Sequence, residues 1–385
     1  MRHYCRQSRE KGIDMGKWIK RISAALGILI VAALAVLAIA MSYDSSCGPP
    51  PAVAGSGTTM KAVTRRCYGP PDVLAVENLE MPVPADNQML VKVQAAAINP
   101  LDWHRVRGTP YVMRLGEGFG APKDPRLGID FAGTVVAVGK DVTRFKPGDE
   151  IFGGKDGALA EYLAVREAGS IALKPANVSF DQAAGTYVAA LTSLQTLRDR
   201  AAVKPGQKVL INGASGGVGT FAVQIAKWLG AEVTGVCSTR NVELVRSLGA
   251  DHVIDYTQED FTEGTERYDV IMDNVVNRPM LDIRRVLKPG GKYIIIGGGG
   301  PDANPWVGAF RAPIKAFVIS WFVDEDMAFF VSHASTEDVV TLATLMAEGK
   351  VTPFVDREYP LAEIQEAMRY LETGRARGKV VITFD

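Results

Sequence analysis

The sequence contains 385 residues, which is too long for one comfortable single-core domain and indicates two domains or one large α/β unit with a second lobe. Lys and Arg together number 43, as do Asp and Glu, and this zero formal net charge argues against a protein that binds nucleic acid. A hydrophobic fraction of 47% excludes a disordered chain, and four scattered cysteines are too few for a disulfide framework or a four-thiolate zinc site.

A basic segment, residues 1–21, precedes an uncharged apolar run at residues 22–41. The basic segment has seven basic and two acidic residues, a net charge of +5, so the rest of the chain carries −5. An apolar helix of this length spans a hydrocarbon core of about 30 Å, which predicts a single-pass transmembrane helix or signal anchor. The positive-inside rule then places the N-terminus in the cytoplasm. The alternative is a cleaved signal peptide, but the run is longer than the usual apolar region of such a peptide.

Residues 42–59 are rich in proline, glycine, serine and threonine and lack helical or strand periodicity, which is typical of a linker. Cys47 lies in this segment and suggests a lipoprotein. However, Asp44 stands three residues before it, where lipidation requires an apolar residue, and we therefore predict no lipid anchor.

Residues 60–185 have the pattern of a compact, largely antiparallel β domain, in which short apolar runs alternate with turn sequences. The predicted strands lie at 60–63, 89–97, 131–138, 150–152 and 158–165. We expect residues from about 326 to 385 to complete this domain with two helices and a closing strand, at 337–348, 361–371 and 379–384.

Residues 186–325 alternate between short, buried-type strands and helices, which predicts a doubly wound parallel sheet of the α/β class. The expected strands lie at 208–212, 232–237, 252–255, 269–273 and 293–296, and the helices at 217–229 and 242–248.

A glycine-rich loop joins the first of these strands to its helix. Gly213, Gly216 and Gly219 match the pattern G-x-x-G-x-x-G, in which glycines permit a tight turn, approach of a phosphate, and close packing of helix on strand. The N-terminus of the helix also attracts a pyrophosphate through its free N–H groups. We therefore predict that a dinucleotide contacts Gly213, Ser215, Gly216, Gly217, Val218 and Gly219.

The same loop also matches the motif G-x-S-x-G, in which Ser215 occupies the position of the nucleophile of an α/β serine hydrolase. A hydrolase also needs an acid and a histidine further along the chain. The later histidines are His252, at the start of a predicted strand, and His333. The additional glycine inside the loop favours phosphate binding, and a hydrolase is the weaker alternative.

The residues after the second strand indicate which dinucleotide is bound. NAD enzymes place a carboxylate there, whereas this chain has Ser238 and Arg240 and no carboxylate before Glu243. A hydroxyl and a guanidinium suit the 2′-phosphate of NADPH, although Arg240 could instead be a solvated residue of the next helix. We predict NADPH as the cofactor, with further contacts from residues that follow later strands, namely Tyr256, Asn274 and Gly297.

Short motifs follow one another along residues 60–385. They are Met-Lys-Ala-Val at 60–63, Asn-Pro-Leu-Asp-Trp at 99–103, Gly-Ile-Asp-Phe-Ala-Gly at 128–133, Lys-Pro-Gly-Asp at 146–149 and Gly-Lys-Val-Val at 378–381. In these motifs the chain resembles the medium-chain dehydrogenase/reductase superfamily, and within it the zinc-independent quinone oxidoreductase branch, which is zeta-crystallin-like. The resemblance implies a GroES-like domain beside a Rossmann domain, and hydride transfer from NADPH to a quinone or an α,β-unsaturated carbonyl.

The resemblance also bears on metal binding. Zinc-dependent relatives need a cysteine near position 99 and a His-Glu pair around 128–133, where this chain has Asn99 and Gly128-Ile129-Asp130. Because Zn²⁺ prefers thiolate and imidazole ligands, we expect no metal site.

Without zinc, hydrogen-bond donors or water must stabilise the charge that develops on the acceptor oxygen. Asn99 offers an amide, Tyr111 a phenol and His104 an imidazole, and these are the predicted catalytic residues. Each has a simpler alternative role: Asn99 could cap a short helix at 100–107, Tyr111 could serve packing, and His104 could be a partly exposed helix residue. A proton donor from solvent is equally compatible with the sequence.

Residues 305–323 are unusually aromatic and apolar, with only Arg311 and Lys315 charged. We favour a buried strand or helix at a subunit interface, and a homodimer is common in the family. The alternatives are a wall for a bulky apolar substrate or a surface that touches a bilayer.

The sequence thus predicts an NADPH-dependent reductase tethered to a membrane, the cell membrane being favoured. The alternative from another class is a non-catalytic NADPH-binding scaffold on a membrane. The side of the membrane stays open, because the charge rule places the body outside the cytoplasm, whereas NADPH is maintained inside. A start at Met60 would remove the anchor altogether.

Overall fold

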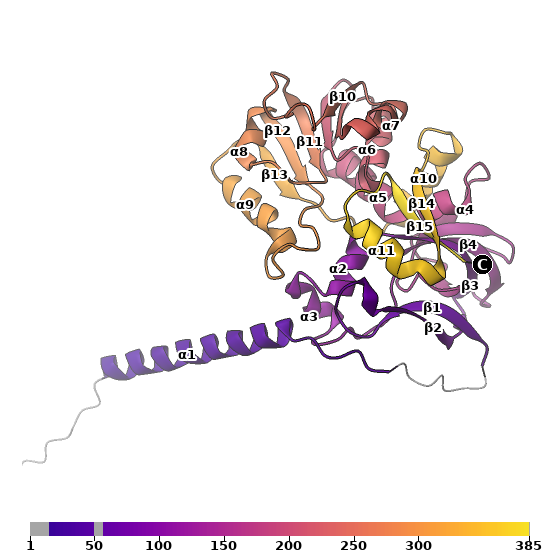
Figure 1. Ribbon diagram of the computed structural model, residues 1–385, viewed down its shortest axis with the longest axis horizontal. Helices are drawn as coiled ribbons and strands as arrows, with labels where there is room; N and C mark the ends of the chain where they lie inside the picture. The colour runs from indigo at the N-terminus through magenta and orange to yellow at the C-terminus, as the bar shows by residue number, and fades with distance from the viewer. Residues whose placement is uncertain (1–14, 50–56, 385) are drawn as a thin grey trace, which may run out of the picture.

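The computed structural model describes residues 15–49 and 57–384, which form a two-lobed body and one long projecting helix (Figure 1). This helix, α1 (Met15–Ser42), contains the apolar run Ile22–Ser42, which has a mean hydropathy of 2.8 and is long enough to cross a membrane. Apolar side chains along the run are exposed, and Met41 at its end is buried against the body. Residues 1–14 of the basic segment and 50–56 of the linker lie outside the described residues.

The first lobe is built on a seven-stranded sheet, to which both the N-terminal half and the C-terminal end of the chain contribute. Its order is β14-β15-β3-β4-β5-β7, and β6 pairs with β3. Most neighbours are antiparallel, as the short apolar runs and turn sequences predict. The strands are β3 (Gln88–Ile98), β4 (Asp130–Val138), β5 (Glu150–Gly154), β6 (Tyr162–Arg166), β7 (Ile171–Leu173), β14 (Val355–Pro360) and β15 (Lys379–Thr383).

Helices and a small hairpin-like pair of strands cover this sheet. The pair β1 (Thr59–Arg65) and β2 (Leu74–Glu80) is antiparallel over its whole length. Residues of α11 on one face pack into the same core as β1 and β3, because apolar residues recur there at helical spacing. The helices are α2 (Pro100–Arg107), α3 (Arg114–Glu117), α4 (Phe180–Ala184), α5 (Tyr187–Leu194), α10 (Thr336–Ala347) and α11 (Ile364–Glu372).

The second lobe is a six-stranded parallel sheet of order β10-β9-β8-β11-β12-β13, the doubly wound arrangement of a Rossmann domain. It takes in β13, and therefore extends past the expected boundary at residue 325. Its elements are β8 (Lys208–Asn212), α6 (Gly217–Trp228), β9 (Glu232–Cys237), α7 (Val242–Ser247), β10 (His252–Asp255), β11 (Tyr268–Asp273), α8 (Met280–Arg285), β12 (Leu287–Ile295), α9 (Arg311–Ile319) and β13 (Asp326–Phe329). The predicted α/β class, with a mainly antiparallel domain beside a parallel sheet, is confirmed.

The aromatic segment at 305–323 forms α9 and its flanking turns. Ala316 of α9 is buried against the sheet edge, but Phe317 and Trp321 are 60% and 72% exposed. The segment is thus helical, and its outer face is not covered by the body of the chain.

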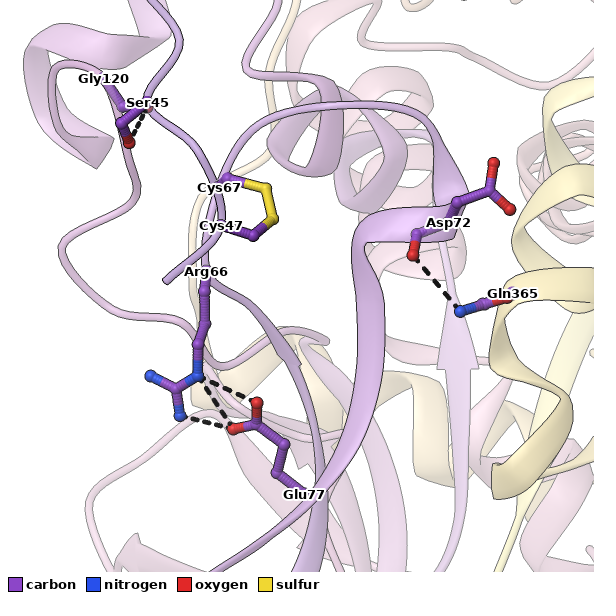
Figure 2. The surroundings of a disulfide bond; sticks show 8 residues. All are labelled: Ser45, Cys47, Arg66, Cys67, Asp72, Glu77, Gly120 and Gln365. Atoms are coloured by element: carbon purple, nitrogen blue, oxygen red, sulfur yellow. Dashed lines mark hydrogen bonds and ion pairs between the residues drawn. A yellow bond between two sulfur atoms is a disulfide. The ribbon is translucent and has the colours of Figure 1, made fainter. Parts of the chain in front are cut away.

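The scattered cysteines include one bonded pair, Cys47–Cys67, which joins the linker to the turn after β1 (Figure 2). The chain around this bond is also fixed by hydrogen bonds, since Ser45 N and Oγ both donate to Gly120 O at 3.0 Å. The end of the apolar helix is therefore held on the first lobe by the contacts of Ser45 and by the disulfide at Cys47.

Candidate functional site

The predicted cofactor residues lie along one edge of the parallel sheet. Gly213, Ser238, Tyr256 and Asn274 each directly follow the last residue of a strand, and Gly297 comes two residues after β12. In this strand order the chain reverses direction between β8 and β11, and the crevice outside the carboxyl ends of such strands is where doubly wound sheets bind ligands. The five residues are therefore gathered at one edge by the topology.

The glycine loop has the geometry that its sequence predicts. Gly213 has a φ of +78°, a left-handed conformation that favours glycine, and Gly216 N donates to Gly213 O at 3.1 Å. A Cβ at Gly219 would stand only 2.1 Å from Gly213 O, so α6 packs on the loop more closely than any side chain allows. Gly217 and Val218 open the first turn of α6, where N–H groups have no partner within the helix. These groups can bind a pyrophosphate.

Ser215 is a structural member of the loop. Its Oγ accepts a hydrogen bond from Asn241 Nδ2 at 2.9 Å, and its carbonyl accepts one from Gly378 N at 2.9 Å. His252 lies at the other end of the sheet, where its ring is 3.1 Å from Glu232 Oε1 at the start of β9. The arrangement of acid, histidine and serine that the hydrolase alternative needs is thus not formed by Ser215 and His252.

The residues predicted to hold the 2′-phosphate face the C-terminal loop of the other lobe. Ser238 Oγ accepts from Asn241 Nδ2 at 3.2 Å, and Arg240 is exposed, with its Nη2 donating to Arg375 O at 2.6 Å. Arg375 is itself exposed, so two guanidinium-bearing residues lie next to the end of β9. Tyr256, beyond β10, is 42% exposed, and its N–H donates to Cys237 O.

The middle of the edge carries an unpaired polar atom. Asn274 Nδ2 donates to Asn212 O at 2.9 Å, whereas Asn274 Oδ1 is buried and has no hydrogen-bond partner among the described residues. A Cβ at Gly297 would stand 2.6 Å from Asn274 O, so the glycine permits close contact between these two strand ends. An acceptor is therefore available beside the glycine loop.

A buried cation links the two lobes below this edge. Lys379 Nζ lies 2.5 Å from Asn99 Oδ1 and 3.2 Å from Asp130 Oδ2, and Lys379 and Asp130 are 3% and 0% exposed. Burial raises the pKa of Asp130, and the Lys379 charge opposes this effect. A Cβ at Gly217 would stand 3.3 Å from Lys379 Cδ, which places the lysine stem directly against the start of α6. We refer to Lys379, Asn99 and Asp130 as the buried cluster.

Asn99 stands at the start of α2, where the sequence suggested that it could cap the helix. It stands before the first residue of α2, and its N–H donates to Asp102 Oδ2 at 2.7 Å. Its side-chain oxygen, however, is taken by Lys379, and Asn99 Nδ2 is buried without a partner among the described residues. Burial raises the pKa of the neighbouring Asp102 to about 6, although the bond from Asn99 N opposes the shift. Asn99 therefore begins the helix and also carries a free amide donor.

The other two predicted catalytic residues have different surroundings. His104 Nδ1 lies 2.6 Å from Thr109 O, and because a carbonyl only accepts, this nitrogen carries the proton. Burial lowers the pKa of His104, and its ring stacks on Trp103 with 3.6 Å between centroids. These contacts favour a neutral imidazole that fixes the turn at Thr109.

Tyr111 lies where the two lobes meet. Its N–H donates to Pro305 O at 2.7 Å, and its ring stands edge-on to Trp306 with 4.9 Å between centroids. The guanidinium of the buried Arg114 lies 4.6 Å from the Tyr111 ring on the other side. The phenol is therefore held between an aromatic residue of the second lobe and a cation of the first.

Sequence reasoning missed Lys379 and Arg375 as members of the site. The signal was present in the run Arg-Ala-Arg-Gly-Lys at 375–379, where two basic residues precede the closing strand and a third begins it. What the run does not reveal is its position, because Lys379 meets Asn99 across 280 residues of chain.

The described residues contain no group of three or more His, Cys, Asp or Glu side chains that could hold a metal ion. At the positions where zinc-dependent enzymes were expected to carry ligands, Asn99 and Asp130 instead bind the ammonium of Lys379.

Comparison with known proteins matches both lobes. Residues 85–175 match the family described as alcohol dehydrogenase GroES-like domain, and residues 248–382 match zinc-binding dehydrogenase. The chain is similar to a 2-methylene-furan-3-one reductase of Solanum lycopersicum, with 36% identity over 84% of this chain and 79% of the relative. A chloroplastic NADPH-dependent alkenal/one oxidoreductase of Arabidopsis thaliana is 36% identical over the same shares. Among solved structures, a quinone oxidoreductase from Coxiella burnetii has a TM-score of 0.72 and 30% identity, covering 85% of this chain and 99% of that one.

Proposed function

The chain belongs to the medium-chain dehydrogenase/reductase superfamily and is an oxidoreductase, and we propose that it transfers a hydride from NADPH to a quinone or to the β-carbon of an α,β-unsaturated carbonyl. Similar proteins include an alkenal/one oxidoreductase and a quinone oxidoreductase, which act on these two kinds of acceptor by name. The acceptor oxygen in both kinds gains negative charge during the reaction, so one site can serve both.

The residues at the carboxyl edge of the Rossmann sheet fit NADPH. The left-handed Gly213 and the tightly packed Gly219 leave the first turn of α6 open to a pyrophosphate. Arg240 and the neighbouring Arg375 supply positive charge where the 2′-phosphate would lie, and the buried Asn274 Oδ1 lacks a partner that a carboxamide could provide. When bound, NADPH supplies the hydride from its nicotinamide ring.

The buried cluster would meet the charge on the acceptor. Lys379 Nζ donates to Asn99 Oδ1, which fixes the orientation of the amide and leaves Asn99 Nδ2 as a free donor. A preorganised donor in a water-excluded site stabilises a developing oxyanion by about 3–4 kcal/mol. Asp130 balances the ammonium charge and holds it between the lobes. Lys379 is in this proposal a positioning residue, and Asn99 the residue that contacts the acceptor.

The observation that carries this function is the pairing of the glycine loop with the buried cluster, across Gly217 and Lys379. The test uses the purified full chain, NADPH and three acceptors, namely an enone, a para-quinone and a saturated ketone of similar size. We expect NADPH oxidation with the first two and none above background with the third. Deuterium at the nicotinamide C4 should appear on the β-carbon of the enone product.

The scaffold alternative predicts a different pattern in the same experiment. A non-catalytic protein would bind NADPH, measured by fluorescence of the reduced ring, yet oxidise none with any acceptor. This outcome would overturn the proposed reaction while leaving the proposed cofactor intact.

We further propose that α1 anchors the enzyme to a membrane, with the body on the side where disulfides form, a side that must then supply NADPH from a pool other than the cytoplasmic one. The run Ile22–Ser42 is apolar enough to span a bilayer, and the positive-inside rule places the residues after it outside the cytoplasm. The Cys47–Cys67 bond agrees, since disulfides persist in oxidising compartments. If intact cells are treated with an alkylating reagent before any reduction, Cys47 and Cys67 should both stay unmodified, because neither has a free thiol in the disulfide. Labelling of both as free thiols would place the body in the cytoplasm.

A further inference from the structure

Helix α9 has an apolar outer face that the body leaves exposed. Three of its residues, Ile314, Phe317 and Val318, lie on α9 at spacing i, i+3 and i+4 and are 54%, 60% and 51% exposed. Trp321, in the turn after the helix, is 72% exposed and extends this surface. Phe317 and Trp321 stack edge-on with 5.3 Å between ring centroids, and Phe322 beside them is 80% exposed. We refer to these five residues as the α9 face.

The inner face of α9 already satisfies the fold. Ala316 is 1% exposed, and Ala312 and Ile319 pack with it against the core of the second lobe. The α9 face is therefore not needed to hold the helix in place. A contiguous exposed group of large apolar side chains of this kind marks a surface that binds something.

Both charged residues of α9 are positive, whereas the acidic residues Asp324 and Glu325 follow the α9 face in the turn before β13. Arg311 and Lys315 lie on the helix, and residues 303–323 contain no Asp or Glu. Aromatic rings combined with basic side chains suit the boundary between acyl chains and anionic headgroups, where rings dissolve among the lipids and Lys or Arg reach the phosphates.

The segment that leads into α9 is connected to the end of the apolar helix by a short series of contacts. Arg114 Nη1 donates to Tyr43 O at 3.0 Å, just after α1, and forms an ion pair with Asp44 at 2.8 Å. The same guanidinium lies against Tyr111, and the Tyr111 ring contacts Trp306, which begins the segment that leads into α9. Figure 1 shows α9 on the side of the second lobe toward which α1 projects.

We propose that the α9 face lies in the interfacial layer of the same bilayer that α1 spans. This inference rests on the membrane anchor of the proposed function, but not on the reaction. It gives the body a second point of attachment, so that the second lobe is held on the membrane as well as the first. It also places the contact between Tyr111 and Trp306 beside the lipid, which favours acceptors that dissolve in the bilayer.

Brominated lipids test the position of the α9 face directly. The full chain is reconstituted in phosphatidylcholine–phosphatidylglycerol vesicles, with and without bromine on the acyl chains, as wild type, W321F and W228F. The difference between wild type and each variant isolates the fluorescence of one tryptophan. We expect bromine to quench most of the Trp321 signal and to leave the signal of Trp228, on α6, unchanged.

A second experiment compares acceptors in the same vesicles. In the variant F317E/W321E, turnover of a long-chain quinone dissolved in the bilayer should fall several-fold, while turnover of a short water-soluble quinone stays at the wild-type value. V83E is the matched control, because Val83 is 86% exposed on the first lobe. Since quenching is measured without turnover, an inactive protein with quenched Trp321 would refute the reaction and keep the bilayer contact.

Two outcomes would overturn the bilayer contact. The first is an unquenched Trp321 in vesicles where the protein is monomeric. The second is an unquenched Trp321 together with a dimer in detergent, measured by native mass, that F317E/W321E dissociates. The second result would assign the α9 face to a second copy of the chain.

Discussion

Besides the packing of α5 on α6, the two lobes meet at two junctions of opposite character, an inner and an outer one. At the inner junction Gly378 N donates to Ser215 O, and Lys379 lies against Gly217 while binding Asn99 and Asp130. At the outer junction, by contrast, Tyr111 contacts Pro305 and Trp306 by one backbone hydrogen bond and an aromatic pair.

The difference lies in what each junction tolerates. Buried charges and directed hydrogen bonds permit one arrangement, because a misplaced ion in a low-dielectric interior costs several kcal/mol. Aromatic surfaces tolerate offsets, since stacked and edge-on geometries differ little in energy. The inner junction therefore suits the fixed geometry of hydride transfer, whereas the outer one can adapt to acceptors of different shape. Four substitutions test this contrast.

Lys379→Met should have the largest effect. It leaves Asp130 buried without its cation, and breaking a buried pair costs about 3–5 kcal/mol of unfolding free energy. It also frees the Asn99 amide to rotate, so we expect kcat to fall about 10²-fold while the affinity for NADPH is retained. Denaturant unfolding and steady-state kinetics measure the two effects.

The double variant Lys379→Met/Asp130→Asn separates stability from positioning. Removing the unpaired carboxylate should restore most of the lost stability, but Asn99 remains without its partner and kcat stays low. Wild-type kcat in the double variant would show that the cluster is structural only.

Asp102→Asn should change how stability depends on pH. Burial raises the pKa of Asp102 from 3.8 to about 6, so the folded state binds the extra proton between these values. The protonated carboxyl of Asp102 therefore adds to the unfolding free energy of the wild type at low pH. This contribution, about 3 kcal/mol in total, is lost as pH rises from about 4 to 6. The variant lacks this loss, and the difference in unfolding free energy between variant and wild type should grow over that range.

Asp149→Asn provides a control of opposite sign. Hydrogen bonds from Lys146 lower the pKa of the Asp149 carboxyl. The contribution of this carboxylate to the unfolding free energy is therefore present above the pKa of the unfolded state and is lost as pH falls through the lower pKa of the folded state. A constant difference in unfolding free energy between Asp102→Asn and wild type over the pH range from about 4 to 6 would mean that folding does not raise the pKa of Asp102.

Arg240→Asp tests the proposed site of the 2′-phosphate after β9, where Arg240 contacts Arg375 of the other lobe. A charge-assisted hydrogen bond is worth about 1.5–3 kcal/mol, and an acidic residue also repels the 2′-phosphate. We expect the preference for NADPH over NADH, measured as a ratio of kcat/KM values, to fall about 10–100-fold. Arg240→Lys, which keeps the charge, should retain most of the preference. An unchanged ratio in Arg240→Asp would refute the assignment of the 2′-phosphate to this residue.

Local patterns made much of the fold predictable from sequence. The strands expected at 208–212, 232–237 and 252–255 coincide with β8, β9 and β10, because buried parallel strands are short apolar runs bounded by turns. β2 was missed, since most of its residues are exposed and polar or small. β13 was missed because it begins at Asp326, the last residue of an acidic run at 324–326 that is not typical of a buried strand.

The site was predictable only where it is local. The glycine loop is contiguous in sequence, and its turn, close approach and helix start can all be recognised from spacing. The buried cluster depends on contacts between segments 249 and 280 residues apart, which no periodicity reveals. The outer junction likewise depends on the contact between Tyr111 and Trp306 of the other lobe. The sequence predicted Tyr111 as a hydrogen-bond donor or a packing residue but did not indicate this partner.

The smallest expected effect is at the outer junction, with Trp306→Ala. The edge-on contact with Tyr111 is worth about 0.5–1.5 kcal/mol, so its loss should raise KM for a bulky quinone about 2–10-fold. The affinity for NADPH and kcat with a small enone should not change, because the inner junction is intact. Trp306→Phe keeps an aromatic edge and should restore KM to near the wild-type value. If Trp306→Ala instead lowered kcat for every acceptor alike, the outer junction would be required for the reaction as strictly as the inner one. The proposed contrast, in which the inner junction fixes the reaction geometry and the outer one adapts to the acceptor, would then be wrong.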